Sequence, residues 1–278
     1  MKRVDGHVTL VTGASRGVGR GIALALGAAG ATVYVTGRTT DADPPGELPG
    51  TIDATVREVT AAGGHAIALR CDHRDDAQVE AVFARIEADH GRLDLLVNNV
   101  WGGYERMVED GVYRFADPFW QQPLSRWDSM FEAGVRAHYV ASAFAARLMV
   151  AVGRGLIVNI SFFAAQKYLS NVAYGVSKAA TDRLTRDCAH ELRAHGVAVV
   201  SLYPGLVRTE SVMRAADYLD LSNSESPEFV GRAVAALAAD PDVLRRSGEV
   251  LVAAALAREY GFTDLDGRTP RALSLAEI

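Results

Sequence analysis

Short apolar runs alternate along the chain with longer stretches in which apolar and polar residues are mixed. The runs are continuously apolar, which is typical of a parallel sheet covered on both faces. They predict strands over His7–Val11, Ala31–Thr36, Ala66–Cys71, Leu93–Asn98, Leu156–Ser161, Val197–Tyr203 and Glu249–Val252. The mixed stretches predict helices, the first ending near Ala29 and the others spanning Ile52–Ala62, Ala77–His90, Leu124–Val150, Ala173–Ala194 and Pro227–Ala239.

This alternation continues without an internal repeat or a linker rich in Pro or Ser, so residues 1–278 are expected to form one doubly wound α/β domain. Three stretches interrupt it. Residues 39–50 are rich in Asp, Pro and Gly, residues 101–123 form a long aromatic loop, and residues 206–226 are polar and are interpreted as a substrate lid. Residues 253–278 follow as a C-terminal extension. Loops that follow strands line the ligand crevice of a parallel sheet, so the second and third stretches are expected to be functional.

Composition argues against several classes of protein. The net charge of −5 disfavours a nucleic-acid-binding domain. Cys71 and Cys188 lie far apart without a C-x-x-C pair, which predicts two reduced thiols, and the histidines show no metal-ligand spacing. The longest apolar run, Ile22–Val35, contains two glycines and predicts no membrane span, which needs about 20 apolar residues. No secretory signal follows Met1, so a cytoplasmic protein is expected.

A glycine-rich turn separates the first predicted strand from the first helix. It reads Thr12-Gly-Ala-Ser-Arg-Gly-Val-Gly19. Gly13 permits the turn, Gly17 lets the backbone approach a phosphate, and Gly19 lets helix and strand pack closely. A helix N-terminus at this place can bind the pyrophosphate of a dinucleotide. The alternative is a tight turn that serves packing alone.

The end of the second predicted strand indicates which dinucleotide is bound. An acid here would bond the ribose 2′-OH of NAD, whereas an arginine suits the 2′-phosphate of NADP. The strand ends Val35-Thr36-Gly37-Arg38, with no acid, and Arg16 in the glycine-rich turn is expected to join Arg38 on the same phosphate. NADP(H) is therefore preferred, with NAD(H) as the alternative. Arg38 as an ordinary surface arginine is the structural alternative.

Candidate proton-transfer residues follow in the second half of the chain. Tyr174 and Lys178 are four residues apart and share one helix face. A neighbouring ammonium favours the phenolate and would fit Tyr174 for general acid/base catalysis on a carbonyl or alcohol oxygen. Ser161 closes a predicted strand, where its hydroxyl could hold the same oxygen. A packed tyrosine with a snorkelling lysine, and a serine that caps a turn, are the alternatives.

These residues occur in an order that resembles the short-chain dehydrogenase/reductase family. The resemblance is carried by Thr12–Gly19, Asp72, Asn98-Asn99, Ser161, Tyr174 with Lys178, and Pro204-Gly205. One branch of the family is matched further by Asp187–Arg193, Leu237–Pro241, Ala257–Gly261 and Asp266–Arg268. The resemblance implies a Rossmann fold with a seven-stranded parallel sheet in the order 3-2-1-4-5-6-7 and helices on both faces. It also implies a homodimer or homotetramer that uses the two helices predicted over 124–150 and 173–194.

The resemblance further implies a role for each matching residue. Asp72 and His73 would meet the adenine. Asn98 would stabilise the sheet centre, and its backbone would lie near the adenine ribose. Lys178 would bind the nicotinamide ribose, while Tyr174, which is also a cofactor-binding candidate, protonates the substrate oxygen. The remaining cofactor-binding candidates are Gly13, Ser15, Arg16, Gly17, Val18, Gly19, Arg38, Asn99, Val100, Pro204, Gly205, Val207 and Thr209, the last four lying around the nicotinamide.

Three departures from the family pattern stand out. Val100-Trp101 replaces the usual Ala-Gly, Gly134 stands where many members have an active-site asparagine, and Phe162 replaces a second serine after Ser161. A proton relay through the asparagine position would then need another route. The aromatic residues of 101–123 are expected either to pack the long loop or to line a pocket for a bulky substrate.

Two functions remain from the sequence. The first is an NADP(H)-dependent oxidoreductase acting on a carbonyl or secondary alcohol, with a bulky apolar substrate and Tyr174 as general acid/base. The second is a dinucleotide-binding regulatory or partner protein with little catalysis, which Gly134 and Phe162 alone support.

Overall fold

The chain folds around one seven-stranded parallel sheet. The computed structural model describes residues 3–43, 46, 48–103, 108–109, 112–214 and 216–278. The strands are β1 (Val8–Val11), β2 (Thr32–Gly37), β3 (His65–Arg70), β4 (Leu95–Asn98), β7 (Gly155–Ile160), β8 (Val197–Tyr203) and β9 (Val250–Val252). Their order is β3-β2-β1-β4-β7-β8-β9, and every pairing is parallel. The predicted order 3-2-1-4-5-6-7 is confirmed.

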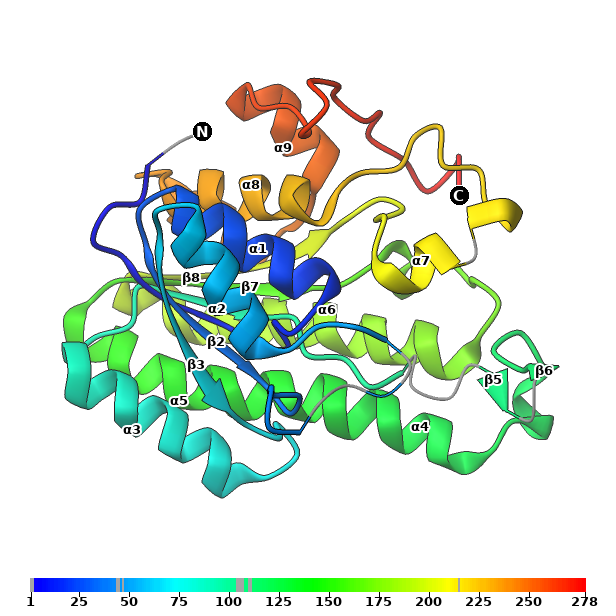
Figure 1. The fold of residues 1–278 in the computed structure, drawn as a ribbon, viewed down its shortest axis with the longest axis horizontal. Helices are drawn as coiled ribbons and strands as arrows, with labels where there is room; N and C mark the ends of the chain where they lie inside the picture. Colours follow the sequence, from blue (N-terminus) through cyan, green and yellow to red (C-terminus); the bar gives the residue numbers. More distant parts are fainter. Residues whose placement is uncertain (1–2, 44–45, 47, 104–107, 110–111, 215) are drawn as a thin grey trace.

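Helices cover both faces of this sheet (Figure 1). One face carries α1 (Gly17–Ala28), α2 (Ile52–Ala61), α8 (Pro227–Ala238) and α9 (Ala253–Tyr260). The other carries α3 (Asp76–His90), α5 (Ala137–Val152) and α6 (Val172–Leu192). Two hydrophobic cores result, one on each side of the sheet.

Successive residues of a strand contribute to opposite cores, as the pleat of a strand requires. Leu10 packs with α3 and α5 on one side, whereas Val11 packs with α1 and α8 on the other. Leu96 and Leu95 divide between the cores in the same way. Both faces of each central strand are therefore buried, which explains why the strands appear in the sequence as unbroken apolar runs.

Helices α1 and α8 approach each other closely because glycines lie at their contact. A Cβ on Gly21 would lie 2.2 Å from the backbone carbon of Pro227, and one on Gly231 would lie 2.6 Å from Cβ of Ala25. Any larger residue at Gly21 or Gly231 would separate the two helices. The N-terminus of α1 is thereby held firmly at the edge of the sheet where the candidate site lies.

The helix predicted over Leu124–Val150 is interrupted. It consists of α4 (Leu124–Met130), a π-helical segment over Phe131–Arg136, and α5. Ala133 leaves the helical region, with φ −90° and ψ 19°. Among the described residues, the stretch from Leu124 is the one helix long and apolar enough to cross a membrane by length and composition. Its α5 part packs on the sheet through Ala141, Ala145 and Met149, as a core helix does.

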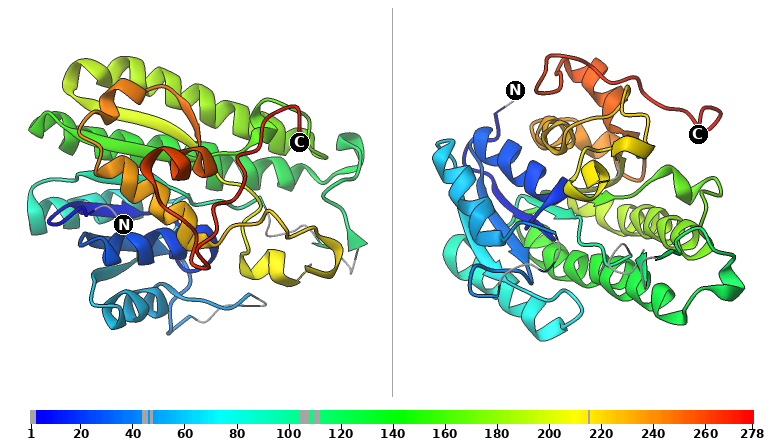
Figure 2. Two further views of the ribbon diagram at one scale, coloured as in Figure 1. Left: turned by 90° about the horizontal axis from the view of Figure 1, so that it is seen from above. Right: turned by 45° about the vertical axis from the view of Figure 1, so that its right-hand side comes forward.

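The stretches predicted as irregular contain short elements. Residues 101–123 include a hairpin of β5 (Val108–Glu109) and β6 (Val112–Tyr113), while Tyr104 lies outside the described residues. Residues 206–226 contain α7 (Glu210–Arg214), and the C-terminal extension begins with α9. Figure 2 shows the extension running back beside residues 206–226. Asp264 accepts hydrogen bonds there from the Ser226 backbone (2.9 Å) and the Arg208 guanidinium (3.0 Å).

A row of buried polar side chains crosses the centre of the sheet. Asn98 of β4 lies opposite Asn159 of β7, which lies opposite Ser201 of β8. Asn98 Nδ2 donates to Asn159 Oδ1 at 2.8 Å, and Asn159 Nδ2 donates to Thr185 Oγ1 of α6 at 2.8 Å. The hydroxyls of Thr185 and Ser201 are also 2.8 Å apart. The expectation that Asn98 stabilises the sheet centre agrees with these contacts.

Candidate active site

The candidate residues gather at the carboxyl ends of the central strands. Gly13 follows β1, Asn99 follows β4, Ser161 follows β7 and Pro204 follows β8. In an open parallel α/β sheet this edge, near the point where the strand order reverses, is the usual ligand crevice. The topology thus brings together residues from four distant parts of the chain.

The glycine-rich turn is fitted against the end of β4. Gly13 has φ +67°, and a Cβ on it would lie 2.8 Å from Cα of Val100. A Cβ on Gly19 would lie 2.4 Å from Asn99 Nδ2, which itself donates to the carbonyls of Thr12 (2.9 Å) and Gly13 (3.0 Å). The first and last glycines of the turn are therefore required by close packing against Asn99 and Val100. Ser15 and Val18 lie within the same turn and the start of α1.

Gly17 presents its backbone N–H at the N-terminus of α1. Its φ is +56°, and the N–H donates to Oε2 of Glu210 at 2.9 Å. Thr209 lies on the same side, its Cγ2 3.4 Å from where a Cβ on Gly17 would be. A helix N-terminus favours an anion, and here a carboxylate of the 206–226 segment meets it. Sequence reasoning missed Glu210, although an acid so soon after Pro204-Gly205 was visible.

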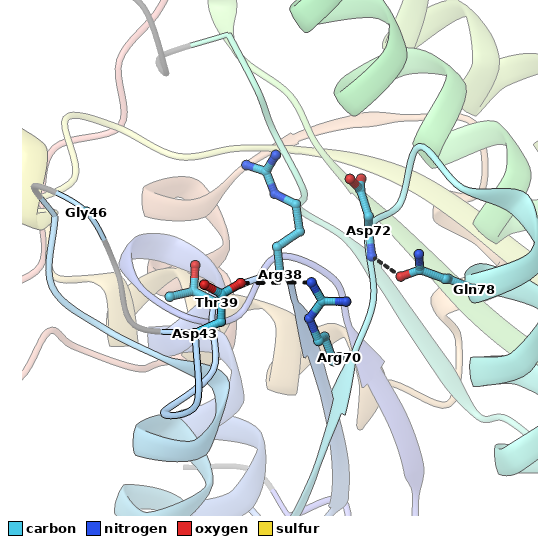
Figure 3. A pocket seen from close by; sticks show the side chains of 7 residues that line it. All are labelled: Arg38, Thr39, Asp43, Gly46, Arg70, Asp72 and Gln78. Carbon is cyan, nitrogen blue, oxygen red and sulfur yellow. Dashed lines mark hydrogen bonds and ion pairs between the residues drawn. The ribbon is translucent and has the colours of Figure 1, made fainter.

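A cavity of about 370 Å³ opens beside the ends of β2 and β3 (Figure 3). It is lined by Arg38, Thr39, Asp43, Gly46, Arg70, Asp72 and Gln78. Arg70 is the last residue of β3 and pairs in register with Gly37. Its backbone therefore lies beside that of Arg38, which follows Gly37. Arg70 lies 3.9 Å from the carboxylate of Asp43. Two arginines thus line one cavity, and the second was not among the predicted residues because β3 was interpreted only as a strand.

Arg16 of the glycine-rich turn bonds the backbone just before α2. Its Nε donates to the carbonyl of Pro49 at 3.0 Å, and a terminal nitrogen donates to the carbonyl of Gly50 at 3.2 Å. These bonds hold the loop over residues 39–50 against the glycine-rich turn. Arg16 is not among the described residues that line the cavity of Arg38.

Asp72 and His73 differ in accessibility. The Arg74 guanidinium bonds the Asp72 carboxylate at 2.6 Å and holds the pKa of that carboxyl below its usual range. His73 is buried, and its Nε2 lies 2.8 Å from the Thr36 hydroxyl. Burial lowers the pKa of His73 to about 4, so the imidazole is neutral at physiological pH. Asp72 lines the cavity, whereas the His73 ring faces the sheet.

Tyr174, Lys178 and Ser161 come together beside the ends of β7 and α6. Tyr174 lies in the first turn of α6, whose N-cap Asn171 accepts the Tyr174 N–H at 2.9 Å. Lys178 Nζ donates to the carbonyl of Ile160 at 3.3 Å, and the Ser161 hydroxyl donates to the carbonyl of Lys178 at 3.4 Å. Burial lowers the pKa of Lys178 to about 8. The three residues predicted as catalytic therefore lie close together in the fold.

Aromatic rings surround Tyr174, whose residue is only 7% exposed. The ring centroids of Trp101, Phe115 and Phe162 lie 5.9, 5.7 and 6.3 Å from its own. By contrast, Phe119 (63%) and Trp120 (71%) are exposed. Trp101, Phe115 and Phe162 therefore form an apolar wall around the tyrosine, whereas Phe119 and Trp120 are exposed to solvent.

Phe115 is fixed to the start of the candidate catalytic helix by hydrogen bonds. Its carbonyl accepts from Asn171 Nδ2 at 2.8 Å and from Gln122 Nε2 at 3.0 Å. Asn171 therefore caps α6 with its oxygen and holds the aromatic stretch with its nitrogen. The position of the apolar wall is tied to that of Tyr174.

Beside the turn that follows β8 lies a buried acid, Glu225, which was not among the predicted site residues. Oε1 of Glu225 accepts the backbone N–H of Gly205 at 2.9 Å, and the backbone of Glu225 bridges to Val207. Burial raises the pKa of Glu225 to about 7. Glu225 thus fixes the turn after Pro204 and connects it to the far end of the 206–226 segment. The only sequence signal was an acid within a polar stretch.

Comparison of the sequence with known proteins gives matches along most of its length. A family model described as short chain dehydrogenase matches residues 7–219. The chain is 46% identical over 279 residues to dehydrogenase/reductase SDR family member 1 of Mus musculus, covering 95% of this chain and 85% of the relative. It is 30% identical over 211 residues to 7alpha-hydroxysteroid dehydrogenase of Escherichia coli (strain K12), covering 76% and 74%.

Solved structures share the fold. A 7 alpha-hydroxysteroid dehydrogenase complexed with NADH and 7-oxo glycochenodeoxycholic acid has a TM-score of 0.74 at 27% identity, covering 90% of this chain and 93% of that one. A metagenomic short-chain oxidoreductase in complex with NADP has a TM-score of 0.70 at 33% identity, covering 89% and 96%.

Proposed function

The chain belongs to the short-chain dehydrogenase/reductase family, whose members bind a nicotinamide dinucleotide, and from this premise we propose that it is an NADP(H)-dependent oxidoreductase. It interconverts a carbonyl and a secondary alcohol, with Tyr174 as the general acid/base. The observation that carries the proposal is the assembly of Tyr174, Lys178 and Ser161 at the carboxyl edge of the sheet. The bound dinucleotide supplies or accepts the hydride.

The residues at this edge fit a dinucleotide with an extra phosphate. The turn of Gly13, Gly17 and Gly19 places the N-terminus of α1 at this edge, and a helix N-terminus favours a diphosphate. Arg38 and Arg70 line the cavity beside the second strand, which has no acid at its end. Guanidinium groups bind phosphate through bidentate, charge-assisted hydrogen bonds. This combination supports NADP(H) over NAD(H).

Tyr174 would exchange a proton with the substrate oxygen. The Lys178 ammonium, 5.9 Å from the centre of the tyrosine ring, favours the ionised phenol and eases that exchange. Lys178 is itself fixed by the carbonyl of Ile160. Ser161 can turn its hydroxyl from the Lys178 carbonyl, a long contact of 3.4 Å, to the substrate oxygen.

The substrate proposed is a bulky apolar ketone or alcohol, such as a steroid-like or aromatic carbonyl compound. Trp101, Phe115 and Phe162 provide an apolar wall around Tyr174. Residues 206–226 would serve as a lid, because Thr209 and Glu210 lie against the glycine-rich turn. The names of the hydroxysteroid dehydrogenases that resemble the chain also support this class.

A homo-oligomer is proposed as the working form. Tyr139 on α5 and Val172 and Val176 on α6 are large apolar side chains exposed to solvent. Helices α5 and α6 are the ones that the family resemblance implies for a subunit contact.

The test of the proposed function is an absorbance assay. The protein is mixed with NADPH or NADH and a panel of ketones from small aliphatic to steroidal, and the near-ultraviolet band of the reduced nicotinamide is followed. Turnover is expected for bulky apolar members, with a lower KM for NADPH than for NADH. Binding of the dinucleotide without turnover of any ketone, or of any secondary alcohol in the reverse direction, would favour a regulatory protein instead.

Glu210 should weaken cofactor binding, because its carboxylate occupies the N–H of Gly17 that a diphosphate would use. Glu210→Gln keeps the shape of the side chain and removes the charge. We expect the Kd of NADPH to fall about 2- to 5-fold, since an anion at a helix N-terminus is worth about 0.3–1 kcal/mol. Titration calorimetry measures the change.

Asp220→Asn is the matched control for this prediction. It removes the same charge from the same segment, but Asp220 is exposed and its carboxylate accepts from the Ser222 backbone. Equal Kd values for Glu210→Gln and Asp220→Asn would show that Glu210 does not compete with the cofactor.

A further inference from the structure

The indole of Trp101 contacts both members of the Tyr174–Lys178 pair. Lys178 Nζ lies 4.0 Å from the centroid of the Trp101 ring. The same ring packs edge-on against Tyr174. A cation within about 6 Å of an indole face is attracted by the quadrupole of the ring. Lys178 is therefore held by the carbonyl of Ile160 and by an aromatic face.

Two glycines make room for the indole. A Cβ on Gly134 would lie 2.8 Å from Cζ3 and 2.9 Å from Cε3 of Trp101. A Cβ on Gly103 would lie 2.6 Å from Cζ2 and 2.7 Å from Cε2. Gly134 lies in the π-helical segment between α4 and α5, and such interruptions of a helix frequently occur at functional sites. The backbone on two sides is thus shaped to fit this one ring.

Few other charges act on Lys178. On α6, the carboxylate of Asp182 favours the protonated amine, and it also accepts the hydroxyl of Tyr203. On α5, His138 is buried, and burial together with the charge of Lys178 lowers the pKa of its imidazole to about 3. Strand β7 contributes the neutral carbonyl of Ile160. The ammonium of Lys178 thus lies in a sparsely charged site. Among the described residues, the indole of Trp101 is its closest aromatic contact.

We propose that Trp101 is a positioning residue, whose indole holds the Lys178 ammonium beside Tyr174 and keeps water away from it. This inference rests on the proposed function. Without intervening water, the charge of the ammonium acts on the phenol at a low local dielectric, where its effect is larger. Removing the ring would let water solvate the ammonium. Hydration stabilises the charged form more than the indole face does, so the pKa of Lys178 would rise toward its ordinary range.

The first test uses cofactor-free protein and measures the contact itself. In the variant Trp120→Phe/Trp127→Phe, Trp101 is the one tryptophan that remains of the three in the chain. Its emission is expected to shift with a midpoint near pH 8, where Lys178 titrates, because the ammonium alters the field at the indole. Lys178→Met should abolish the shift. A shift that is missing, or that persists after Lys178→Met, overturns the proposal whether or not the protein proves to be an oxidoreductase.

The second test separates positioning from simple packing. For carbonyl reduction, kcat should fall as the pH rises through about 8, because the ammonium is lost. Trp101→Ala should move this fall upward by roughly one pH unit, part of the way to the ordinary lysine pKa of about 10.4. Trp101→Phe, which keeps a ring, should move it less.

Gly134→Ala supplies a further variant, in which residue 101 is still tryptophan but its indole is displaced. The added methyl group would displace the indole, so the fall in kcat should again move to higher pH. In the Trp101→Ala background the same change should have no further effect on the midpoint, because no indole remains to displace. Variants that lower kcat equally at every pH, with an unmoved midpoint, would show that Trp101 only packs and would overturn the proposal.

Discussion

Tyr174→Phe is expected to lower kcat by about 10²- to 10⁴-fold, the range that general acid/base catalysis contributes. The change removes the hydroxyl alone. The ring contacts with Trp101, Phe115 and Phe162 remain, so the apolar wall should keep its place. The Kd of NADPH, measured by titration calorimetry, should stay within error of the unmodified protein. Loss of turnover with intact binding would assign the proton transfer to this residue.

Tyr168→Phe is the matched control for that experiment. Tyr168 lies between Ser161 and the start of α6 and is exposed, so removal of its hydroxyl should leave kcat unchanged. If Tyr174→Phe retained turnover similar to Tyr168→Phe, Tyr174 could not be the general acid/base. If Tyr174→Phe lost cofactor binding together with turnover, the hydroxyl would be needed for the structure of the site.

Arg38→Ala is expected to raise the Kd of NADPH by roughly 10- to 150-fold, because a hydrogen bond to a charged group contributes about 1.5–3 kcal/mol. The Kd of NADH should change little, since NADH lacks the 2′-phosphate. Arg38→Lys should recover part of the affinity, because lysine keeps the charge but not the bidentate geometry. Arg70→Ala should weaken NADPH selectively as well, because Arg70 lines the same cavity.

Arg154→Ala controls for the loss of one positive charge. Arg154 pairs with Asp94 near the start of β4 and β7, at the opposite end of those strands from the site. It should leave both Kd values unchanged. A Kd that rises equally for NADPH and NADH in Arg38→Ala would contradict a role in reading the 2′-phosphate. Arg16→Ala tests the expectation that Arg16 joins Arg38 on the 2′-phosphate. In the structure, the Arg16 guanidinium bonds the carbonyls of Pro49 and Gly50.

The strands could be predicted from the sequence because both of their faces are buried. Val197–Tyr203 is apolar or small at every position, and its predicted and observed bounds agree. The break between α4 and α5 could not be predicted in the same way. Its apolar residues have helical spacing throughout, and the π-helical segment fits around Trp101, which the chain supplies from a different loop. Local sequence therefore revealed the elements but not this tertiary distortion.

The candidate site was predictable where one motif carries the whole feature. The glycine-rich turn and the spacing of Tyr174 and Lys178 are local patterns, and the structure places them where expected. Arg70, Glu210 and Glu225 are different, because each is an ordinary polar residue until the fold brings it to its contact. Arg16 belongs to the glycine-rich turn itself, and the fold brings its guanidinium to the carbonyls of Pro49 and Gly50.

The polar row across β4, β7 and β8 has a consequence for the assembly of the sheet. Apolar strands buried on both faces can pair in several alignments, because a shift of one residue still places hydrophobic groups against hydrophobic groups. Here such a slip would turn the amide of Asn159 toward the opposite core and separate it from Asn98 and Thr185. Each buried polar group left unpaired costs about 1–3 kcal/mol. These polar side chains can pair only in the native register, so the row disfavours misregistered sheets during folding.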